Sequence, residues 1–370
     1  MIQHPLALTT VIVGVTALAF WLAGRFGWAA KVGATLLVIA FGAVLSNLDL
    51  VASRSPVYGL ISGPVTSLAI VWLLFAVDLK SLRAAGPRML QAFALAVLST
   101  TVGGLAAFAL FGDHFPGAAA ELAGVMVGTY SGGGLNFVAV GRELDLAESL
   151  FVAATAADNV VTALWLALSL MLPVWLRRLY PAQRHVPDPA DGPADPMHGA
   201  ASFSVGELAT LGALGLALVL AAERLAAWAP AVPGILWLTT LALLCAQLRW
   251  VRRLSGAMQL GTLALHLFFA VLGIGSRGRE ILAVGVEVFY FTALVVLVHG
   301  VLFLILARLR GLDIDTTVVA SQAAVGGPST AMAMAVSRRR PDLTLPGAMA
   351  GLAGYAVGTY AGLLVAWALR

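Results

Sequence analysis

A single carboxylate lies in the middle of a long apolar segment of this chain. Asp158 is followed by Asn159 in the run VAATAADNVVTALW, which contains no basic residue. A charged side chain at the centre of a lipid bilayer costs roughly 3 kcal/mol, so we expect Asp158 to face protein or a polar cavity. There it can carry a proton or coordinate Na⁺, with help from the Asn159 amide. The alternative is a structural carboxylate that holds the helices together by hydrogen bonds.

Two glycine-rich interruptions of apolar segments offer further ligands. They read GTYSGGGLNFVAVG over residues 128–141 and SQAAVGGPST over residues 321–330. A broken helix is tolerated in lipid only where protein or a polar cavity satisfies the freed backbone groups. Half-helices direct N–H groups at anions and carbonyls at cations. The candidate substrate- or ion-binding residues are therefore Ser131, Gly132, Gly133, Gly134, Asn136, Asp158, Asn159, Gln322, Gly326, Gly327, Ser329 and Thr330.

Close helix packing is the alternative explanation for the glycines, and it accounts for the series Gly351, Gly354, Gly358 and Gly362. His266, His299 and Glu287 also fall inside apolar runs. We interpret the two histidines as hydrogen-bonded core residues, and Glu287 as a side chain that reaches the membrane interface. The sequence contains no P-loop, HExxH motif or cysteine–histidine metal spacing.

The composition of the chain indicates a helical membrane protein. The chain has 370 residues, of which 60% are hydrophobic and 11% charged, and its mean hydropathy is +0.94. A soluble domain cannot bury so much apolar surface, and the apolar runs do not alternate as barrel strands would. Most cations lie between apolar runs, so they indicate membrane topology and not nucleic-acid binding. The single Cys245 excludes an intrachain disulfide, and no cleavable signal peptide is evident.

Twelve apolar segments approach the length of about 20 residues that a membrane helix needs. We divide the chain into a first membrane repeat (1–176), a polar linker (177–206) rich in proline, aspartate and arginine, and a second membrane repeat (207–370). The predicted spans are 6–23, 32–48, 57–77, 89–111, 118–140 and 149–176 in the first repeat, and 208–228, 234–248, 257–274, 281–306, 316–336 and 345–369 in the second. The broken segments are the fifth span of each repeat.

The two repeats are expected to be inverted relative to each other. Basic residues place the loops after residues 25, 80, 249 and 308 inside, together with the linker. Taken separately, the two halves then run their broken spans in opposite directions, as inverted repeats require. With twelve crossings, however, these loops cannot all lie inside, and the run Arg338, Arg339, Arg340 falls outside. The spans therefore number about 11–13.

Four motifs together resemble the YjcL-like family of bacterial membrane proteins: GTYSGGGLNFVAV, AADNVV, ASQAAVGGPSTAMAMA and PGAMAGLAGYAVGTYAG. The similarity covers nearly the whole chain. The family is grouped with the superfamily of cation:proton antiporters and anion transporters. This grouping implies an all-α polytopic protein with inverted repeats, two crossing discontinuous helices and an elevator-type core that moves against a panel domain.

The resemblance also implies roles for particular residues. Asp158–Asn159 is similar to the acidic pair of sodium/proton antiporters, although the second residue here is an amide. The second half of this chain contains no lysine, so the lysine counter-charge of such antiporters is absent. Gln322 is in a position similar to that of polar ligands in sodium symporters.

We therefore expect an ion-coupled secondary transporter of the bacterial inner membrane, not an enzyme. It would use Na⁺ or H⁺ to move a small anionic solute, or exchange a cation for protons, by alternating access. Asp158 would be the coupling carboxylate and a Na⁺ ligand, with no other cofactor. We expect the lipid bilayer and a second copy of the chain, in a homodimer, as partners. The alternatives are a passive channel or a membrane-embedded enzyme, such as a serine hydrolase that uses Ser329 with His266 or His299 as base.

Overall fold

The computed structural model describes residues 2–52, 55–79, 81–181, 204–230, 232–275 and 278–370, and these are almost entirely helical. Eight of their helices are long and apolar enough to cross a membrane, which confirms a polytopic membrane protein. The helices before the linker are α1 (Pro5–Arg25), α2 (Gly27–Val32), α3 (Ala34–Asn47), α4 (Pro56–Leu60), α5 (Thr66–Leu74), α6 (Gly86–Phe111), α7 (Ala119–Thr129), α8 (Gly134–Glu143) and α9 (Glu148–Leu176). Those after it are α10 (Val205–Trp228), α11 (Gly234–Ala246), α12 (Ala257–Gly275), α13 (Gly278–Leu309), α14 (Ile314–Val325), α15 (Gly327–Ser337) and α16 (Thr344–Leu369).

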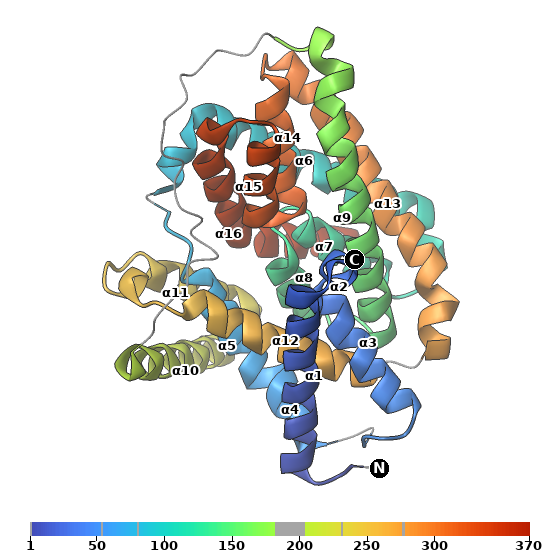
Figure 1. Cartoon of the computed structure of the whole chain (residues 1–370), viewed down its shortest axis with the longest axis vertical. Coiled ribbons are helices and arrows are strands. Elements are labelled where there is room, and N and C mark those ends of the chain that lie inside the picture. Colours follow the sequence, from blue (N-terminus) through green and yellow to red (C-terminus); the bar gives the residue numbers. More distant parts are fainter. Residues whose placement is uncertain (1, 53–54, 80, 182–203, 231, 276–277) are drawn as a thin grey trace.

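The helices form two bundles, and each bundle takes helices from both halves of the chain (Figure 1). We name the first the panel bundle, which consists of α1–α5 with α10–α12, and the second the core bundle, which consists of α6–α9 with α13–α16. Helices α4 and α5 are continuous through a π-helical turn, Ile61–Val65, that contains Pro64. The predicted linker lies outside the described residues except at its two ends.

Both broken segments turn back on themselves instead of crossing the molecule. Helices α14 and α15 lie side by side (Figure 1), and Asp315 in the first turn of α14 forms an ion pair of 2.8 Å with Arg338 just after α15. In the other hairpin, a side chain added at Gly124 on α7 would lie 3.3 Å from Leu144, just after α8. The prediction of two crossing, membrane-spanning broken helices is therefore wrong, and each segment is a helical hairpin.

The hairpins have a simple physical cause. Each arm has only 10–12 residues, or about 16 Å of helix, which is half the thickness of the hydrocarbon core. At the turns, Gly133 and Gly327 both adopt φ of +83°, a left-handed conformation that glycine tolerates without steric cost. A side chain added at Gly133 would lie 3.8 Å from Gly327 Cα, so the tips of the two hairpins meet.

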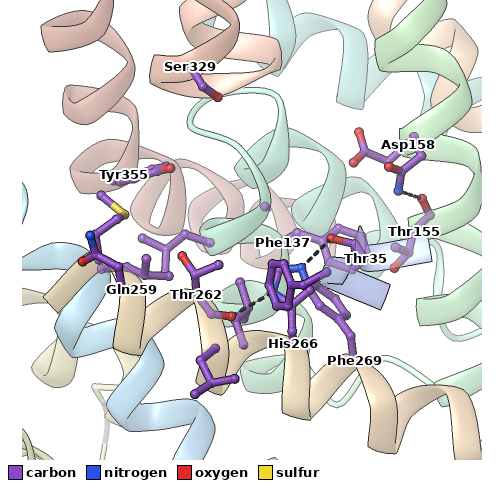
Figure 2. Close-up of a pocket in the computed structure, with 18 residues that line it drawn as sticks. Thr35, Phe137, Thr155, Asp158, Gln259, Thr262, His266, Phe269, Ser329 and Tyr355 are labelled. Carbon is purple, nitrogen blue, oxygen red and sulfur yellow. Dashed lines mark hydrogen bonds between the residues drawn. The ribbon is translucent and has the colours of Figure 1, made fainter. Parts of the chain in front are cut away.

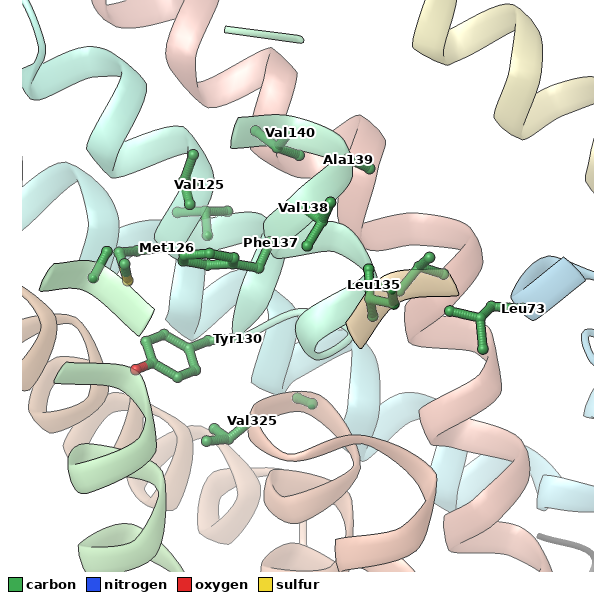
Figure 3. Packing of buried hydrophobic residues seen from close by; sticks show 14 of the residues in the cluster. Leu73, Val125, Met126, Tyr130, Leu135, Phe137, Val138, Ala139, Val140 and Val325 are labelled. Atoms are coloured by element: carbon green, nitrogen blue, oxygen red, sulfur yellow. The ribbon is translucent and has the colours of Figure 1, made fainter. Parts of the chain in front are cut away.

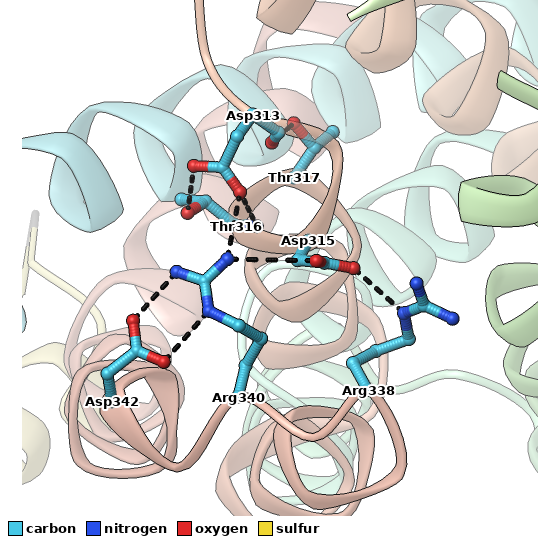
Figure 4. A network of polar contacts seen from close by, with 7 residues as sticks. All are labelled: Asp313, Asp315, Thr316, Thr317, Arg338, Arg340 and Asp342. Atoms are coloured by element: carbon cyan, nitrogen blue, oxygen red, sulfur yellow. Dashed lines mark hydrogen bonds and ion pairs between the residues drawn. The ribbon is translucent and has the colours of Figure 1, made fainter. Parts of the chain in front are cut away.

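A network of charges closes the base of the α14–α15 hairpin (Figure 4). Arg340 forms a bidentate pair with Asp342 through hydrogen bonds of 2.8 and 2.7 Å, and it also lies 3.5 Å from Asp313. The hydrogen bonds to Asp342 raise the pKa of the Arg340 guanidinium, so this residue stays charged. Planar bidentate pairs of this kind hold both partners in one geometry. The network thus fixes the start of α14 and the end of α15 relative to α16.

Glycines bring the first hairpin into close contact with α16. Glycines at four-residue spacing on α7 and in the hairpin turn face a second glycine series on α16, which runs in the opposite direction. The backbone contacts are so short that a side chain at any of these positions except Gly128 would overlap the opposite helix, and one at Gly128 would lie a tight 3.3 Å from the Gly358 carbonyl. The facing pairs are Gly124 with Gly362, Gly128 with Gly358, and Gly132 with Gly354. This confirms packing as the role of the α16 glycines.

Candidate functional site

A cavity of about 610 Å³ lies between the panel and core bundles (Figure 2). The core bundle contributes the beginning of α8, the middle of α9, the beginning of α15 and one tyrosine of α16. The panel bundle contributes one face of α12 and single residues of α1, α3 and α5. The polar residues around it are Thr35, Thr155, Asp158, Asn159, Gln259, Thr262, His266, Ser329 and Tyr355, and the apolar ones include Phe20, Leu73, Leu135, Phe137, Met258, Leu263, Leu265 and Phe269.

Four of the predicted site residues line this cavity: Gly134, Asp158, Asn159 and Ser329. Asp158 accepts a hydrogen bond of 2.9 Å from Thr162, one turn further along α9. Asn159 donates its amide N–H to the Thr155 carbonyl at 2.8 Å, so its amide group is held against its own helix. Ser329 is exposed to the cavity from the first turn of α15 (Figure 2). The predicted carboxylate and the two hairpins therefore meet at one place.

Two other predicted residues, Ser131 and Gln322, are completely buried within the core bundle and do not line the cavity. Gln322 donates its amide N–H to Ser169 at 3.0 Å, but its oxygen has no hydrogen-bond partner among the described residues. The Ser131 hydroxyl also lacks a partner in the described part of the chain. Buried polar groups nearly always have partners, so these oxygens are available for a ligand such as a cation.

Tyr130, which precedes the first glycine run, was not predicted as a site residue. Its side chain is fully buried, and its hydroxyl points toward α9 (Figure 3). On that helix the hydroxyl faces Asp158 and Thr162. The hydroxyl makes no hydrogen bond of normal geometry with any described residue. Asp158 therefore has the open cavity on one side and an unused hydroxyl donor on the other.

The remaining predicted residues act in the structure of the hairpins. Asn136 donates to the Gly354 carbonyl at 3.1 Å and accepts from the Thr359 hydroxyl at 2.8 Å, which directs its side chain to α16 and away from the cavity. Thr330 donates to the carbonyls of Gln322 and Gly327, two backbone groups at the turn of its hairpin. The remaining glycines form the turns or close contacts: Gly132, Gly133, Gly326 and Gly327.

His299 connects four helices behind the hairpin tips. Thr100 has one hydroxyl proton, which it donates to the Tyr130 carbonyl at 3.0 Å, so His299 Nδ1–H must donate to the Thr100 oxygen at 2.9 Å. His299 Nε2 then accepts from the Ser321 hydroxyl at 2.9 Å, and Ser321 accepts from the Trp165 indole at 2.9 Å. His299 Nδ1 also lies 3.2 Å from the Ala96 carbonyl, so both ring nitrogens are hydrogen-bonded within the core, as expected.

His266 lies on the cavity wall instead of in the core. Its Nδ1 is 2.8 Å from the Thr262 carbonyl, its Nε2 is 3.3 Å from the Thr35 hydroxyl, and its ring packs 4.6 Å from Phe20. Gln259, Thr262 and His266 share one face of α12, and this helical spacing of polar residues in an apolar run is the signal that could have revealed them. Glu287 lies on α13 and does not line the cavity.

Comparisons with known proteins agree with the resemblance seen in the sequence. Residues 10–370 match the family described as "Protein of unknown function (DUF819)". The "Uncharacterized membrane protein YjcL" of Bacillus subtilis (strain 168) is 28% identical over 365 residues, which cover 94% of this chain and 92% of that relative. The predicted similarity to YjcL-like membrane proteins is thereby confirmed.

Proposed function

We propose that this chain, which belongs to the DUF819 family, is an ion-coupled secondary transporter of a small solute. The observation that carries this proposal is the position of the cavity. It lies between two bundles, contains one carboxylate in the middle of a long apolar helix, and reaches the tips of both hairpins. An intramembrane carboxylate in such a place is a functional site by default, because its burial in lipid would otherwise be costly.

Pairwise packing of the helices supports inverted repeats. Helix α1 packs on α3 and α12, and α10 packs on α11 and α5. In the same way α3 packs on α12 and α11 on α5, while α6 and α13 pack on each other. This is the pattern expected if α1, α3, α5 and α6 correspond to α10, α11, α12 and α13. The hairpins α7–α8 and α14–α15 then correspond as well, with α9 and α16 following them, and repeats of this kind place a binding site at their interface.

The chemistry of the cavity suits a cation and a carboxylate together. Asp158 with the Thr162 and Tyr130 hydroxyls provides oxygen atoms for H⁺ or Na⁺. Helices α8 and α15 begin at the cavity with Gly134 and with the turn that contains Ser329. Their N-terminal N–H groups and dipoles attract a solute carboxylate. We propose that the core bundle carries the ligand that is bound past the panel bundle in an elevator-type movement, in a homodimer in the bacterial inner membrane.

Replacement of Asp158 tests this function. In proteoliposomes with an imposed Na⁺ or H⁺ gradient, Asp158→Asn should abolish gradient-dependent solute accumulation, because the amide keeps the shape but removes the ionisable group. Glu287→Gln is the matched control, since Glu287 is a carboxylate in an apolar helix away from the cavity, and it should transport like the wild type. Wild-type accumulation by a correctly inserted Asp158→Asn protein would remove Asp158 from the mechanism.

The positions of Ser329, His266 and His299 give weaker support to the alternative of a serine hydrolase. A serine hydrolase needs a base within hydrogen-bonding reach of its nucleophile. The ring nitrogens of His266 contact Thr262 and Thr35, and those of His299 contact Thr100, Ala96 and Ser321. Neither histidine contacts Ser329 in the described structure. A passive channel would conduct without any dependence on a coupling ion, so the proteoliposome experiment also distinguishes that case.

A further inference from the structure

We propose that the solute is a small zwitterionic amino acid with an apolar side chain. The movement of this solute across the membrane rests on the proposed transport function. The chemical class of the solute does not, because it follows from the residues that line the cavity. The chemistry follows from the way in which three kinds of surface are distributed around the cavity. A carboxylate lies on one side, two helix N-termini on another, and an aromatic and aliphatic wall completes the enclosure (Figure 2).

The charges around the cavity favour a solute that carries its own positive group. Asp158 is the only carboxylate that lines it, and no lysine or arginine does so among the described residues. His266 has both ring nitrogens engaged by Thr262 and Thr35, so neither is free to bind the solute. A purely anionic solute would therefore meet the Asp158 carboxylate with no cationic side chain to compensate. A solute ammonium group would pair with Asp158 directly, and charge-assisted hydrogen bonds of this type are among the strong ones.

The hairpin tips provide the position for the carboxylate of the solute. Helices α8 and α15 have 10 and 11 residues, and both begin at the cavity. No atom lies within 4 Å of the position where a side chain at Gly134 would be, so a ligand can approach the backbone there closely. Ser329 adds a hydroxyl that is exposed to the same space. A carboxylate in this position and an ammonium at Asp158 would use both polar sides of the cavity at once.

The remaining wall is suited to an apolar side chain. Phe20 packs against the His266 ring with centroids 4.6 Å apart, and Phe269 lies 6.0 Å from the same ring. Phe137 contributes a further aromatic ring close to His266 in this view (Figure 2). Burial of an aliphatic or aromatic side chain against these rings gives a favourable contribution that a polar side chain would lose. We therefore expect leucine-like and phenylalanine-like side chains to be preferred.

The single carboxylate also determines the mode of coupling. A solute ammonium group and a coupling cation would both bind at the Asp158 carboxylate, because it is the only carboxylate that lines the cavity among the described residues. The ion and the amino acid should therefore compete for it, and each should leave when the other binds. Competition of this kind produces exchange of the amino acid for H⁺ or Na⁺.

Binding measurements on purified protein with three matched probes test the proposal. L-Leucine carries both charged groups, 4-methylpentanoate lacks the amine, and 3-methylbutylamine lacks the carboxylate. We expect leucine to bind at least about tenfold more tightly than either half, since each half loses one charge-assisted interaction. Asp158→Asn should weaken leucine binding by about tenfold or more. It should strengthen 4-methylpentanoate binding, because the variant removes the charge that repels an anion, while Glu287→Gln should change neither. Added Na⁺ or H⁺ should compete with leucine.

The wild-type series alone can overturn the proposal if Asp158→Asn does not fold. Leucine that fails to bind, or 4-methylpentanoate that binds as tightly as leucine, contradicts a zwitterionic solute. Ion-driven accumulation of amine-free carboxylates without any transport of leucine would also contradict it, while the proposed transport function would stand. Leucine binding with the predicted Asp158 dependence, but with no gradient-driven transport, would support the binding chemistry and contradict the transport function.

Discussion

Three buried oxygens near the hairpin tips have no hydrogen-bond partner among the described residues: the Tyr130 and Ser131 hydroxyls and the Gln322 carbonyl oxygen. An unsatisfied buried polar group costs about 1–3 kcal/mol, which an apolar side chain of similar size would avoid. Such groups are rare in folded proteins unless water, an ion or a functional role accounts for them. Their location in and beside the two predicted breaks fits a cation that binds in one state of the proposed transport cycle.

Removal of the Tyr130 hydroxyl distinguishes a role in binding the coupling cation from a role in stabilising the fold. Tyr130→Phe should leave the melting temperature close to that of the wild type, because the hydroxyl makes no hydrogen bond of normal geometry with any described residue. It should raise the concentration of coupling ion needed for half-maximal transport, because Asp158 loses the hydroxyl that faces it. Both quantities can be measured on the same preparation, by thermal unfolding in detergent and by ion titration in proteoliposomes.

Tyr180→Phe is the matched control for this prediction. The Tyr180 hydroxyl is far from Asp158 along the chain and donates to the Leu304 carbonyl at 2.6 Å. Its removal should lower the stability by about 1 kcal/mol and leave the ion dependence unchanged. If Tyr130→Phe instead behaves like Tyr180→Phe, with lower stability and an unaltered ion response, the Tyr130 hydroxyl is a structural group.

At the scale of secondary-structure elements, the position of the first hairpin depends on glycines that face α16. A methyl group at Gly132 would overlap the Gly354 carbonyl, and backbone atoms cannot move aside as a flexible side chain can. Gly132→Ala should therefore destabilise the protein by about 1–3 kcal/mol or more, and it should displace the hairpin tip and impair transport. Thermal unfolding and gradient-driven uptake measure the two effects.

Gly134→Ala, two residues away in the same glycine run, provides the comparison. A methyl group there has no atom within 4 Å, and alanine is the better residue at a helical position. The stability should be equal or higher, and any loss of transport would come from the cavity that Gly134 lines. Equal stability of the two variants would show that close packing on α16 does not hold the hairpin.

The sequence predicted where the helices break, but not what the chain does after each break. Three consecutive glycines and the Gly–Gly–Pro run exclude a regular helix, so the interruptions could be placed correctly. The reversal of direction depends on contacts between distant residues, such as the ion pair of Asp315 with Arg338, and no local pattern encodes these. The site shows the same limit. Asp158 stands out in the sequence as a charge in an apolar run. Tyr130 and His266 do not, because Tyr130 faces Asp158 only where the first hairpin packs near α9, and His266 lines the cavity only because α12 packs beside the core bundle.

At the scale of the whole molecule, the hairpins remove the conflict in the predicted topology. A hairpin leaves the membrane on the side where it entered, so neither broken segment counts as a crossing. If the two shorter apolar helices α3 and α11 also cross, they and the eight long helices give ten crossings among the described residues. With the N-terminus outside, the loops that contain Arg88, Arg177, Arg253 and Arg308 all lie inside, and so does the run of arginines after α15. This agrees with the preference of basic residues for the cytoplasmic side.

Cysteine labelling on either side of each hairpin tests this arrangement. The single-cysteine variants are made in a Cys245→Ser background at exposed residues on either side of each hairpin. Asp113→Cys and Asp145→Cys flank the first hairpin, and Arg310→Cys and Arg339→Cys flank the second. A membrane-impermeant maleimide should label the first two in intact cells, and the other two only after permeabilisation. The members of each pair should agree with each other, because a hairpin returns to its own side. Opposite accessibility of Arg310→Cys and Arg339→Cys would mean that α14 and α15 cross the membrane after all, and it would place the arginine run outside.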